Sequence, residues 1–212
     1  MRQILEHRKG KNNMVINVHA GHNPDGKVAC GAAGFIREST ESRRVKDEVV
    51  NQLRVLGHTV YDCPCENGSG QADVLSKIVT ACNAHTVDLD VSIHFNAGAG
   101  DAVGNGRTTG TEVLVYNTTG GAKKAAEKVS TSISALGFKN RGIKANTSLY
   151  FLRKTKAPAI LIECCFVDDR DDVQLYDCQK MASAIVYGIT GQTVIHKENV
   201  AEDKEASGAN AE

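Results

Sequence analysis

Strand-like and helix-like segments alternate along the chain, and this alternation restricts the fold more than any other feature of the sequence. Apolar runs rich in β-branched residues predict strands at 14–19, 58–63, 89–94, 111–116, 148–152 and 159–164. Apolar residues at helical spacing predict helices at 40–56, 71–85, 120–137 and 171–190. Such alternation indicates a mostly parallel sheet. We therefore expect a single α/β domain, a twisted sheet of about six strands covered by helices on both faces.

The periodic pattern spans residues 14–196 and is missing at both ends of the chain. Residues 1–13 are basic and residues 197–212 are polar and acidic, and neither segment has an apolar periodic face. We expect 1–13 to be a disordered leader or upstream extension and 197–212 to be a disordered tail or truncated linker, both dispensable for folding. Residues 1–13 lack the apolar run of a secretory signal, and no segment is long enough to span a bilayer. These features predict synthesis in the cytoplasm without a signal peptide.

Charge and cysteine content exclude several classes of function. The 25 basic and 25 acidic residues balance, and no basic patch is interleaved with aromatic residues, so a nucleic-acid partner is not expected. The spacing of the seven cysteines fits neither a disulfide framework nor a four-thiolate zinc site. Most of these thiols are expected to be small buried groups. Nothing in the sequence indicates an oligomeric state.

Polar residues of catalytic type follow three of the predicted strands. His19 and His22 follow the first strand, His94 ends the third and Glu163 ends the last, while Glu38 precedes the first long helix. Ligands of open α/β sheets bind beyond the carboxyl ends of the strands. Two histidines and one carboxylate form a common catalytic zinc site, and a further carboxylate suits a general base. From spacing alone, the alternative that each polar residue only caps its own strand stays open.

Four blocks of sequence occur in a recognisable order. They are INVHAGHNPDG, a glutamate before the first long helix, VDLDVSIHFNA, and NRGIKANTSLYFLRKTKAPAILIECCFVDD. Together they resemble the zinc-dependent N-acetylmuramoyl-L-alanine amidases of cell-wall turnover, sporulation and phage lysis. The resemblance covers roughly Met14 to Gly191, and its last block is the most specific.

The resemblance implies a role for each of the candidate residues. His22, Glu38 and His94 match the zinc ligands, and Glu163 matches the catalytic glutamate. His19 stands where the family often has aspartate, and we expect it to orient a neighbouring ligand by a hydrogen bond rather than to bind the metal. Asn96, two residues after His94, is expected to contact the substrate.

The implied function is hydrolysis of the amide between N-acetylmuramic acid and L-alanine of the stem peptide by a zinc-activated water. The implied cofactor is Zn²⁺, and the implied partner is bacterial peptidoglycan, reached after phage or mother-cell lysis. Two alternatives remain from the sequence: a zinc peptidase or deacetylase that acts on another amide, and a wall-binding module without catalysis.

Overall fold

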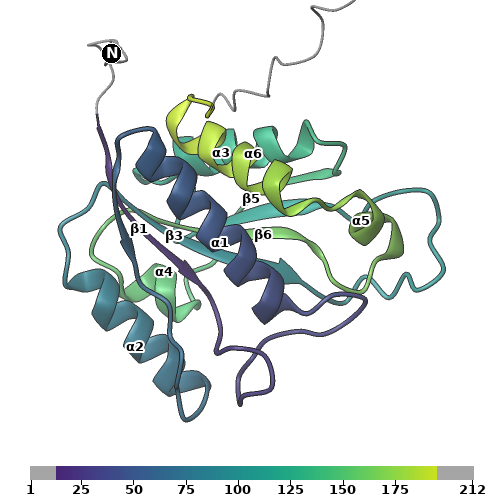
Figure 1. Ribbon diagram of the computed structural model, residues 1–212, viewed down its shortest axis with the longest axis horizontal. Coiled ribbons are helices and arrows are strands. Elements are labelled where there is room, and N and C mark those ends of the chain that lie inside the picture. The colour runs from purple at the N-terminus through teal and green to yellow at the C-terminus, as the bar shows by residue number, and fades with distance from the viewer. Residues whose placement is uncertain (1–12, 195–212) are drawn as a thin grey trace, which may run out of the picture.

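The fold is an α/β domain with one six-stranded sheet in the order β2-β1-β3-β6-β4-β5 (Figure 1). It is seen in a computed structural model that describes residues 13–194. The strands are β1 (Val15–Ala20), β2 (Thr59–Asp62), β3 (Leu89–Asn96), β4 (Thr111–Val115), β5 (Asn140–Ala145) and β6 (Ala159–Phe166). The helices are α1 (Glu38–Val55), α2 (Gln71–Asn83), α3 (Lys123–Ser134), α4 (Tyr150–Lys154), α5 (Arg170–Leu175) and α6 (Cys178–Thr190). The expected leader, apart from Asn13, and the whole of the expected tail lie outside the described residues.

The sheet is mostly parallel, as predicted, with one reversal of direction. β2, β1, β3 and β6 run parallel, β4 pairs with β6 in the antiparallel direction, and β5 runs parallel to β4. Because of the reversal, the first residues of β4 and β5 lie beside the carboxyl end of β6. The carboxyl ends of β2, β1, β3 and β6 and the amino ends of β4 and β5 therefore lie at the same end of the sheet.

One face of the sheet, which we call the apolar face, is covered by α1, α3 and α6 (Figure 1). Strand register places its buried side chains in rows: Val18, Val91 and Ile160 in one row, and Ile93 beside Ile162 in the next. All five are fully buried. Burial of this surface beneath long helices supplies the main hydrophobic stabilisation of the domain.

On the opposite face, which we call the cavity face, the described helices are α2 and the short α4 (Figure 1). A smaller apolar cluster that includes Val74 and Ile78 of α2, Phe151 of α4 and Leu161 of β6 holds these two helices in place. The strands place polar residues on this face, because successive side chains of a strand point to opposite sides. Together α2 and α4 leave part of that polar surface open.

The prediction of a strand at 148–152 was wrong, because the chain turns at residues 148–149 and enters α4 at Tyr150. The side-chain oxygen of Asn146 accepts hydrogen bonds from the backbone N–H groups of Ser148 and Leu149, at 3.0 and 3.2 Å, and turns the chain into the helix. Phe151 and Leu152 then pack into the cluster under α2. A short apolar run does not distinguish a strand from a single buried helical turn, and here tertiary packing decided.

Two further elements differ from the sequence prediction. β5 was missed, because its sequence NRGIKA is polar and contains a glycine. The single helix expected at 171–190 is two helices, α5 and α6, whose first turns are capped by the side chains of Asp169 and Asp177. Glu38 lies in the first turn of α1 rather than before it.

Two other expectations concern burial and helix length. Five of the seven cysteines are buried and the other two are half-buried, as the sequence indicated for most of them. α1 has 18 residues, and none of the helices within residues 13–194 is long and apolar enough to cross a membrane.

Candidate active site

The site is built on a row of three residues that cross adjacent strands on the cavity face. His94 of β3 is the register partner of Glu163 of β6, and Glu163 is the partner of Glu112 of β4. The reversal of β4 creates this row, because it brings an early residue of β4 beside a late residue of β6. A histidine and two carboxylates thus lie side by side at the edge of the sheet.

His22 and Glu38 join His94 to form a cluster of metal-ligand type. His22 Nε2 lies 3.1 Å and His94 Nδ1 lies 2.9 Å from the same carboxylate oxygen, Oε1 of Glu38. One ligand atom from each of the three residues lies within 4.8 Å of the others. Two imidazole nitrogens and one carboxylate oxygen at this separation form a donor set suited to Zn²⁺.

The carboxylate of Glu38 is buried and hydrogen-bonded on both oxygens. Oε2 accepts the backbone N–H of Ala32 at 2.7 Å, and Oε1 accepts that of Phe95 at 3.2 Å. Burial raises the pKa of Glu38, but the contacts with His22 and His94 outweigh it and hold the pKa far below its usual value. Glu38 is therefore ionised, as a metal ligand must be.

Two glycines make room for these side chains. The His94 ring lies against Gly21, and a Cβ at Gly21 would overlap the ring. Gly31 has a φ of +82°, and a Cβ there would press against the Glu38 carboxylate. The glycine before His22 in the AGH motif is thus explained by the close approach of the His94 ring from β3.

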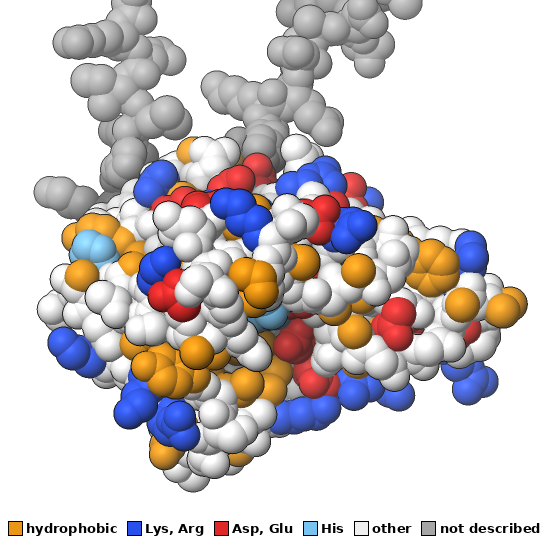
Figure 2. All heavy atoms as spheres, turned by 90° about the horizontal axis from the view of Figure 1, so that it is seen from below, with side chains coloured by type: hydrophobic (Ala, Val, Ile, Leu, Met, Phe, Trp, Pro, Cys, Tyr) orange, Lys and Arg blue, Asp and Glu red, His pale blue; other side chains and the backbone are white. Residues whose placement is uncertain are grey.

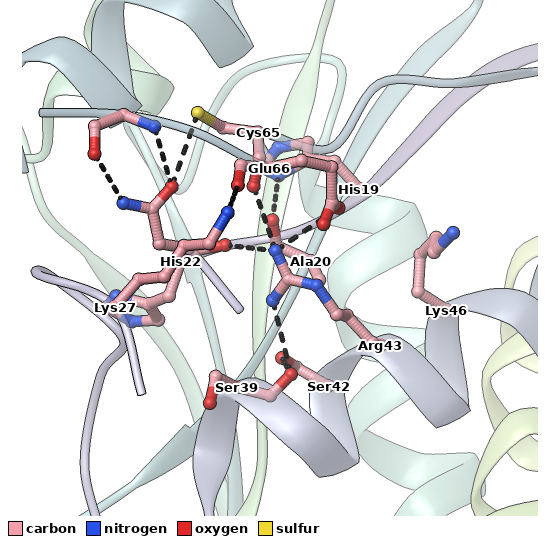
Figure 3. A network of polar contacts seen from close by, with 12 residues as sticks. His19, Ala20, His22, Lys27, Ser39, Ser42, Arg43, Lys46, Cys65 and Glu66 are labelled. Carbon is pink, nitrogen blue, oxygen red and sulfur yellow. Dashed lines mark hydrogen bonds and ion pairs between the residues drawn. The ribbon is translucent and has the colours of Figure 1, made fainter. Parts of the chain in front are cut away.

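Arg43 of α1 braces the segment that carries His22 (Figure 3). Its Nη2 donates to the backbone carbonyl of His22 at 2.7 Å and to that of Cys65 at 2.8 Å. The same group lies 3.3 Å from the Glu66 carboxylate. α1 therefore supplies one candidate ligand, Glu38, and fixes the backbone of another. The sequence analysis did not identify Arg43, because a helical arginine carries no signal of a buried role.

Glu163 lies between the ligand cluster and Glu112. Within residues 13–194, its Oε2 is buried and has no hydrogen-bond partner. Burial, followed by the negative charges of Glu38 and Glu112, raises the pKa of Glu163 to about 8. A carboxyl group with such a pKa can both accept and release a proton near neutral pH.

His19 lies on the cavity face, one strand away from Ser92. Its Nδ1 lies 3.2 Å from the backbone carbonyl of Ala20, its ring packs edge-on against Phe151, and burial lowers its pKa to about 3. In the part of the chain that the structure describes, its Nε2 has no hydrogen-bond partner. The imidazole is thus neutral, and its expected role in orienting a ligand stays a prediction.

A cavity of about 400 Å³ opens beside the cluster. Its polar wall includes His22, His94 and Glu163, and its apolar wall is formed by α2 and α4, including Val74, Ile78, Leu149, Tyr150 and Phe151. Figure 2 shows acidic side chains in a hollow at the middle of this surface, with hydrophobic side chains gathered on one side and Lys or Arg side chains below. A mostly apolar cavity with a few convergent polar groups is typical of a binding site for a small group or a segment of a polymer.

Glu112 is a site residue that the sequence analysis missed. It is the second residue of β4, whereas site residues were expected at the carboxyl ends of strands. Its carboxylate accepts hydrogen bonds from Arg141 at 2.6 Å and from Lys144, both on β5. Asn96 Nδ2 lies 3.3 Å from its other oxygen. Asn96 also lines the cavity, and its expected contact with substrate stays a prediction.

The glycine-rich segment after Asn96 is held by a cluster of aspartates. Asp168 accepts the backbone N–H groups of residues 98–100, Asp171 accepts those of residues 105–107, and Asp169 accepts that of Thr109. The acidic cluster at 168–172 therefore shapes the loop that follows Asn96 and Ala97 of the cavity wall, and Asp169 also caps α5.

Comparison with known proteins agrees with this arrangement. An uncharacterized protein of Clostridium perfringens is 35% identical over 77% of this chain and 47% of its own length. The endolysin of a Bacillus phage, SPP1, is 29% identical over 86% of this chain and 63% of its own length. The chain spans about half the length of the first of the curated relatives that it matches.

Among solved structures, the catalytic domain of an endolysin targeting Clostridia Difficile is similar, with 26% identity and a TM-score of 0.74. The match covers 86% of this chain and 100% of that one. A family model described as N-acetylmuramoyl-L-alanine amidase matches residues 16–191, which include His22, Glu38, His94 and Glu163. The chain belongs to the N-acetylmuramoyl-L-alanine amidase family.

Proposed function

We propose that this chain hydrolyses the amide between the lactyl group of N-acetylmuramic acid and L-alanine in bacterial peptidoglycan, with Zn²⁺ as cofactor. The observation that carries the proposal is the placement of Glu163, whose buried Oε2 has no hydrogen-bond partner within residues 13–194, directly beside the His22–Glu38–His94 cluster. Family membership adds the amide bond of the cell wall as the substrate class.

His22, Glu38 and His94 would hold the metal ion. The fit rests on the donor set, because both imidazole nitrogens face one oxygen of an ionised carboxylate. Zinc bound there supplies a Lewis acid for the amide carbonyl and increases the acidity of water. Arg43 and the hydrogen bonds to Glu38 hold two of these three residues in place, and such supporting contacts affect metal affinity.

Glu163 would move the proton of the reaction. Its Oε2 accepts a proton from water as the water oxygen attacks the carbonyl carbon. As the carbon–nitrogen bond breaks, the same oxygen delivers that proton to the leaving nitrogen of L-alanine. The high pKa of Glu163 favours the second transfer, and the neighbouring Glu38 and Glu112 carboxylates help to maintain that pKa.

The cavity would hold the groups on either side of the scissile bond. Its apolar wall on α2 and α4 matches the methyl groups of lactate and alanine in chemical character. The protein would therefore act on the bacterial cell wall, and relatives named as an endolysin and as an N-acetylmuramoyl-L-alanine amidase are consistent with this location.

Digestion of purified peptidoglycan with mass analysis of the products tests the proposal. We expect new N-terminal L-alanine and intact acetyl groups, and we expect a chelator to abolish product formation until zinc is restored. Cleavage within the peptide would indicate a peptidase, and release of acetate would indicate a deacetylase. Binding to the wall without any product would indicate a non-catalytic module. Each of these three results contradicts the proposal.

A further inference from the structure

A β-bulge in β5 brings two basic side chains to one carboxylate. Thr111 pairs with Asn140, but Val113 pairs with Ile143, so β5 contains one more residue than β4 over this interval. Gly142 lies in the extra segment with a φ of +78°, a conformation that glycine adopts without strain. Residues three apart in a regular strand point to opposite faces. With the bulge, Arg141 and Lys144 both reach Glu112.

The bulge is supported by its own contacts. The side-chain oxygen of Asn140 accepts the backbone N–H of Gly142 at 2.8 Å and the hydroxyl of Ser130 at 2.6 Å. Arg141 is also held from the other side, because its guanidinium lies over the ring of Phe166, 5.0 Å from the centroid. Arg141 of β5 is thus held by contacts with β4 and β6, and the bulge beside it is held by a contact with α3.

The resulting cluster carries an excess of positive charge beside Glu163. Glu112 supplies one negative charge against the two positive charges of Arg141 and Lys144, and contacts with those two groups keep it ionised by lowering its pKa despite its burial. Glu112 is the register partner of Glu163, so the two cations lie beyond Glu112, on the side of Glu163 that faces away from His94.

The two cations also retain donors for a ligand. Arg141 uses only Nε to bind Glu112, and within residues 13–194 its two Nη groups have no hydrogen-bond partner. The side chain of Arg141 is 29% exposed and that of Lys144 is 44% exposed. A guanidinium edge with two free N–H groups matches the geometry of a carboxylate.

We propose that Arg141 and Lys144 form a subsite that binds a carboxylate on the peptide side of the scissile amide. This inference rests on the proposed amidase function and deepens it by naming the charge of the preferred substrate. Glu112 is the positioning residue of the subsite. A purely structural role for the cluster would neutralise Glu112 but would not distinguish a charged from an uncharged peptide.

Two synthetic muropeptides that differ in one group test the proposal. Both carry the peptide L-alanyl-γ-D-glutamyl-L-lysine amide on N-acetylmuramic acid, and in one the α-carboxyl of the glutamate is free while in the other it is amidated. For the zinc-loaded wild-type protein we expect kcat/KM to be at least about tenfold higher for the free carboxylate, the usual worth of a charge-assisted hydrogen bond. A ratio within about twofold of one would overturn the subsite.

Variants then assign the preference to residues. Arg141→Gln should bring the ratio close to one, and Lys144→Gln should reduce it by a smaller factor. The matched control is Lys128→Gln, which removes the same charge from an exposed position on α3 and should leave the ratio unchanged. Zinc content and melting temperature, measured on the same samples, show whether each variant is folded. Should Arg141→Gln fail to fold, the wild-type ratio and Lys144→Gln still decide.

The outcomes separate this proposal from the one on which it rests. Cleavage of neither muropeptide at the muramoyl amide overturns both. Equal cleavage of the two muropeptides overturns only the subsite. A wild-type preference that persists in both Arg141→Gln and Lys144→Gln also overturns the subsite, because other groups must then recognise the carboxylate.

Discussion

Neighbouring residues of β3 point to its two faces, and the two faces differ in role: one packs in the apolar core and the other borders the cavity. Val91 and Ile93 point to the apolar face, where long helices bury them completely. Ser92 and His94 point to the cavity face, where α2 and α4 leave a cavity of about 400 Å³. One strand therefore contributes to stability with every second residue and to the candidate site with the residues between them.

This difference shows which face of the sheet holds buried polar groups that lower the free energy of unfolding. The cavity face holds Glu163 with an unpartnered buried oxygen and a neutral, buried His19. Buried polar atoms without partners reduce the free energy of unfolding. The continuous apolar packing on the other side of the same strands offsets that cost, so the site is confined to one face.

Substitutions of His94 and of the adjacent Ile93 should have the largest effects, one on zinc content and the other on the free energy of unfolding. His94→Ala should lose nearly all of its zinc, because one of three ligands is removed. Ile93→Ala should retain one zinc per chain while the free energy of unfolding falls by about 2–5 kcal/mol, the usual range for such truncation in a core. Metal analysis and denaturant unfolding of both variants measure this contrast. Full zinc occupancy in His94→Ala would show that the ligand set is wrong, and loss of zinc in His19→Ala would then identify the replacement.

A change that keeps the metal but removes the proton carrier should come next in size. Glu163→Gln should retain zinc and fold, since the two side chains are nearly isosteric. Turnover of muropeptides should fall by roughly 10²–10⁴-fold, the usual contribution of a positioned general acid–base group. Zinc content and hydrolysis are measured on one sample. Loss of zinc would make Glu163 a ligand, and retention of both zinc and activity would refute the mechanism.

A substitution at Gly21, which packs against the His94 ring, should reduce zinc affinity by a smaller amount while all three proposed ligands are kept. Gly21→Ala should weaken zinc binding by about 10–100-fold, as disturbance of a ligand's surroundings commonly does, because the added methyl group displaces the His94 ring. Competition with a chromogenic chelator measures the affinity. Gly70→Ala is the control, since a Cβ at Gly70 meets no atom within 4 Å. Equal affinities for the two variants would show that the His94 ring has room to move.

The pH dependence of the metal-free protein should show the smallest effect. The pKa of Glu163 is raised to about 8 by burial, so the folded state keeps a proton that the unfolded state releases above its ordinary pKa of 4.5. The contribution of Glu163 to stability is therefore full below pH 4.5 and declines as the pH rises towards 8. Between pH 6 and 7, the free energy of unfolding of the wild type should fall by about 1–2 kcal/mol relative to that of Glu163→Gln, which does not titrate. Chemical unfolding of both proteins at both pH values measures the difference. If the free energy of unfolding changes equally with pH in the wild type and in Glu163→Gln, Glu163 is solvated.

Much of the site was predictable because its residues follow strongly apolar strands. Ile93 before His94 and Ile162 before Glu163 mark buried strands whose ends carry a polar residue, and the class of fold says where such ends meet. His22 and Glu38 were predicted from the family resemblance, and the structure places both beside His94. Their roles as ligands, and that of Glu163 as a proton carrier, stay predictions.

The sequence by itself determined the α/β class, the parallel core of the sheet and the candidate residues at strand ends, because side-chain periodicity is a local property. Only the tertiary structure decided that β4 reverses direction, that a helix begins at Tyr150 and that the polar segment 140–145 completes the sheet. The reversal of β4 placed Glu112 beside Glu163, and the pairing of 140–145 with β4 placed Arg141 and Lys144 beside Glu112. These features depend on pairing between segments far apart in the chain, whose free energy comes from mutual burial and hydrogen bonding that no local pattern records.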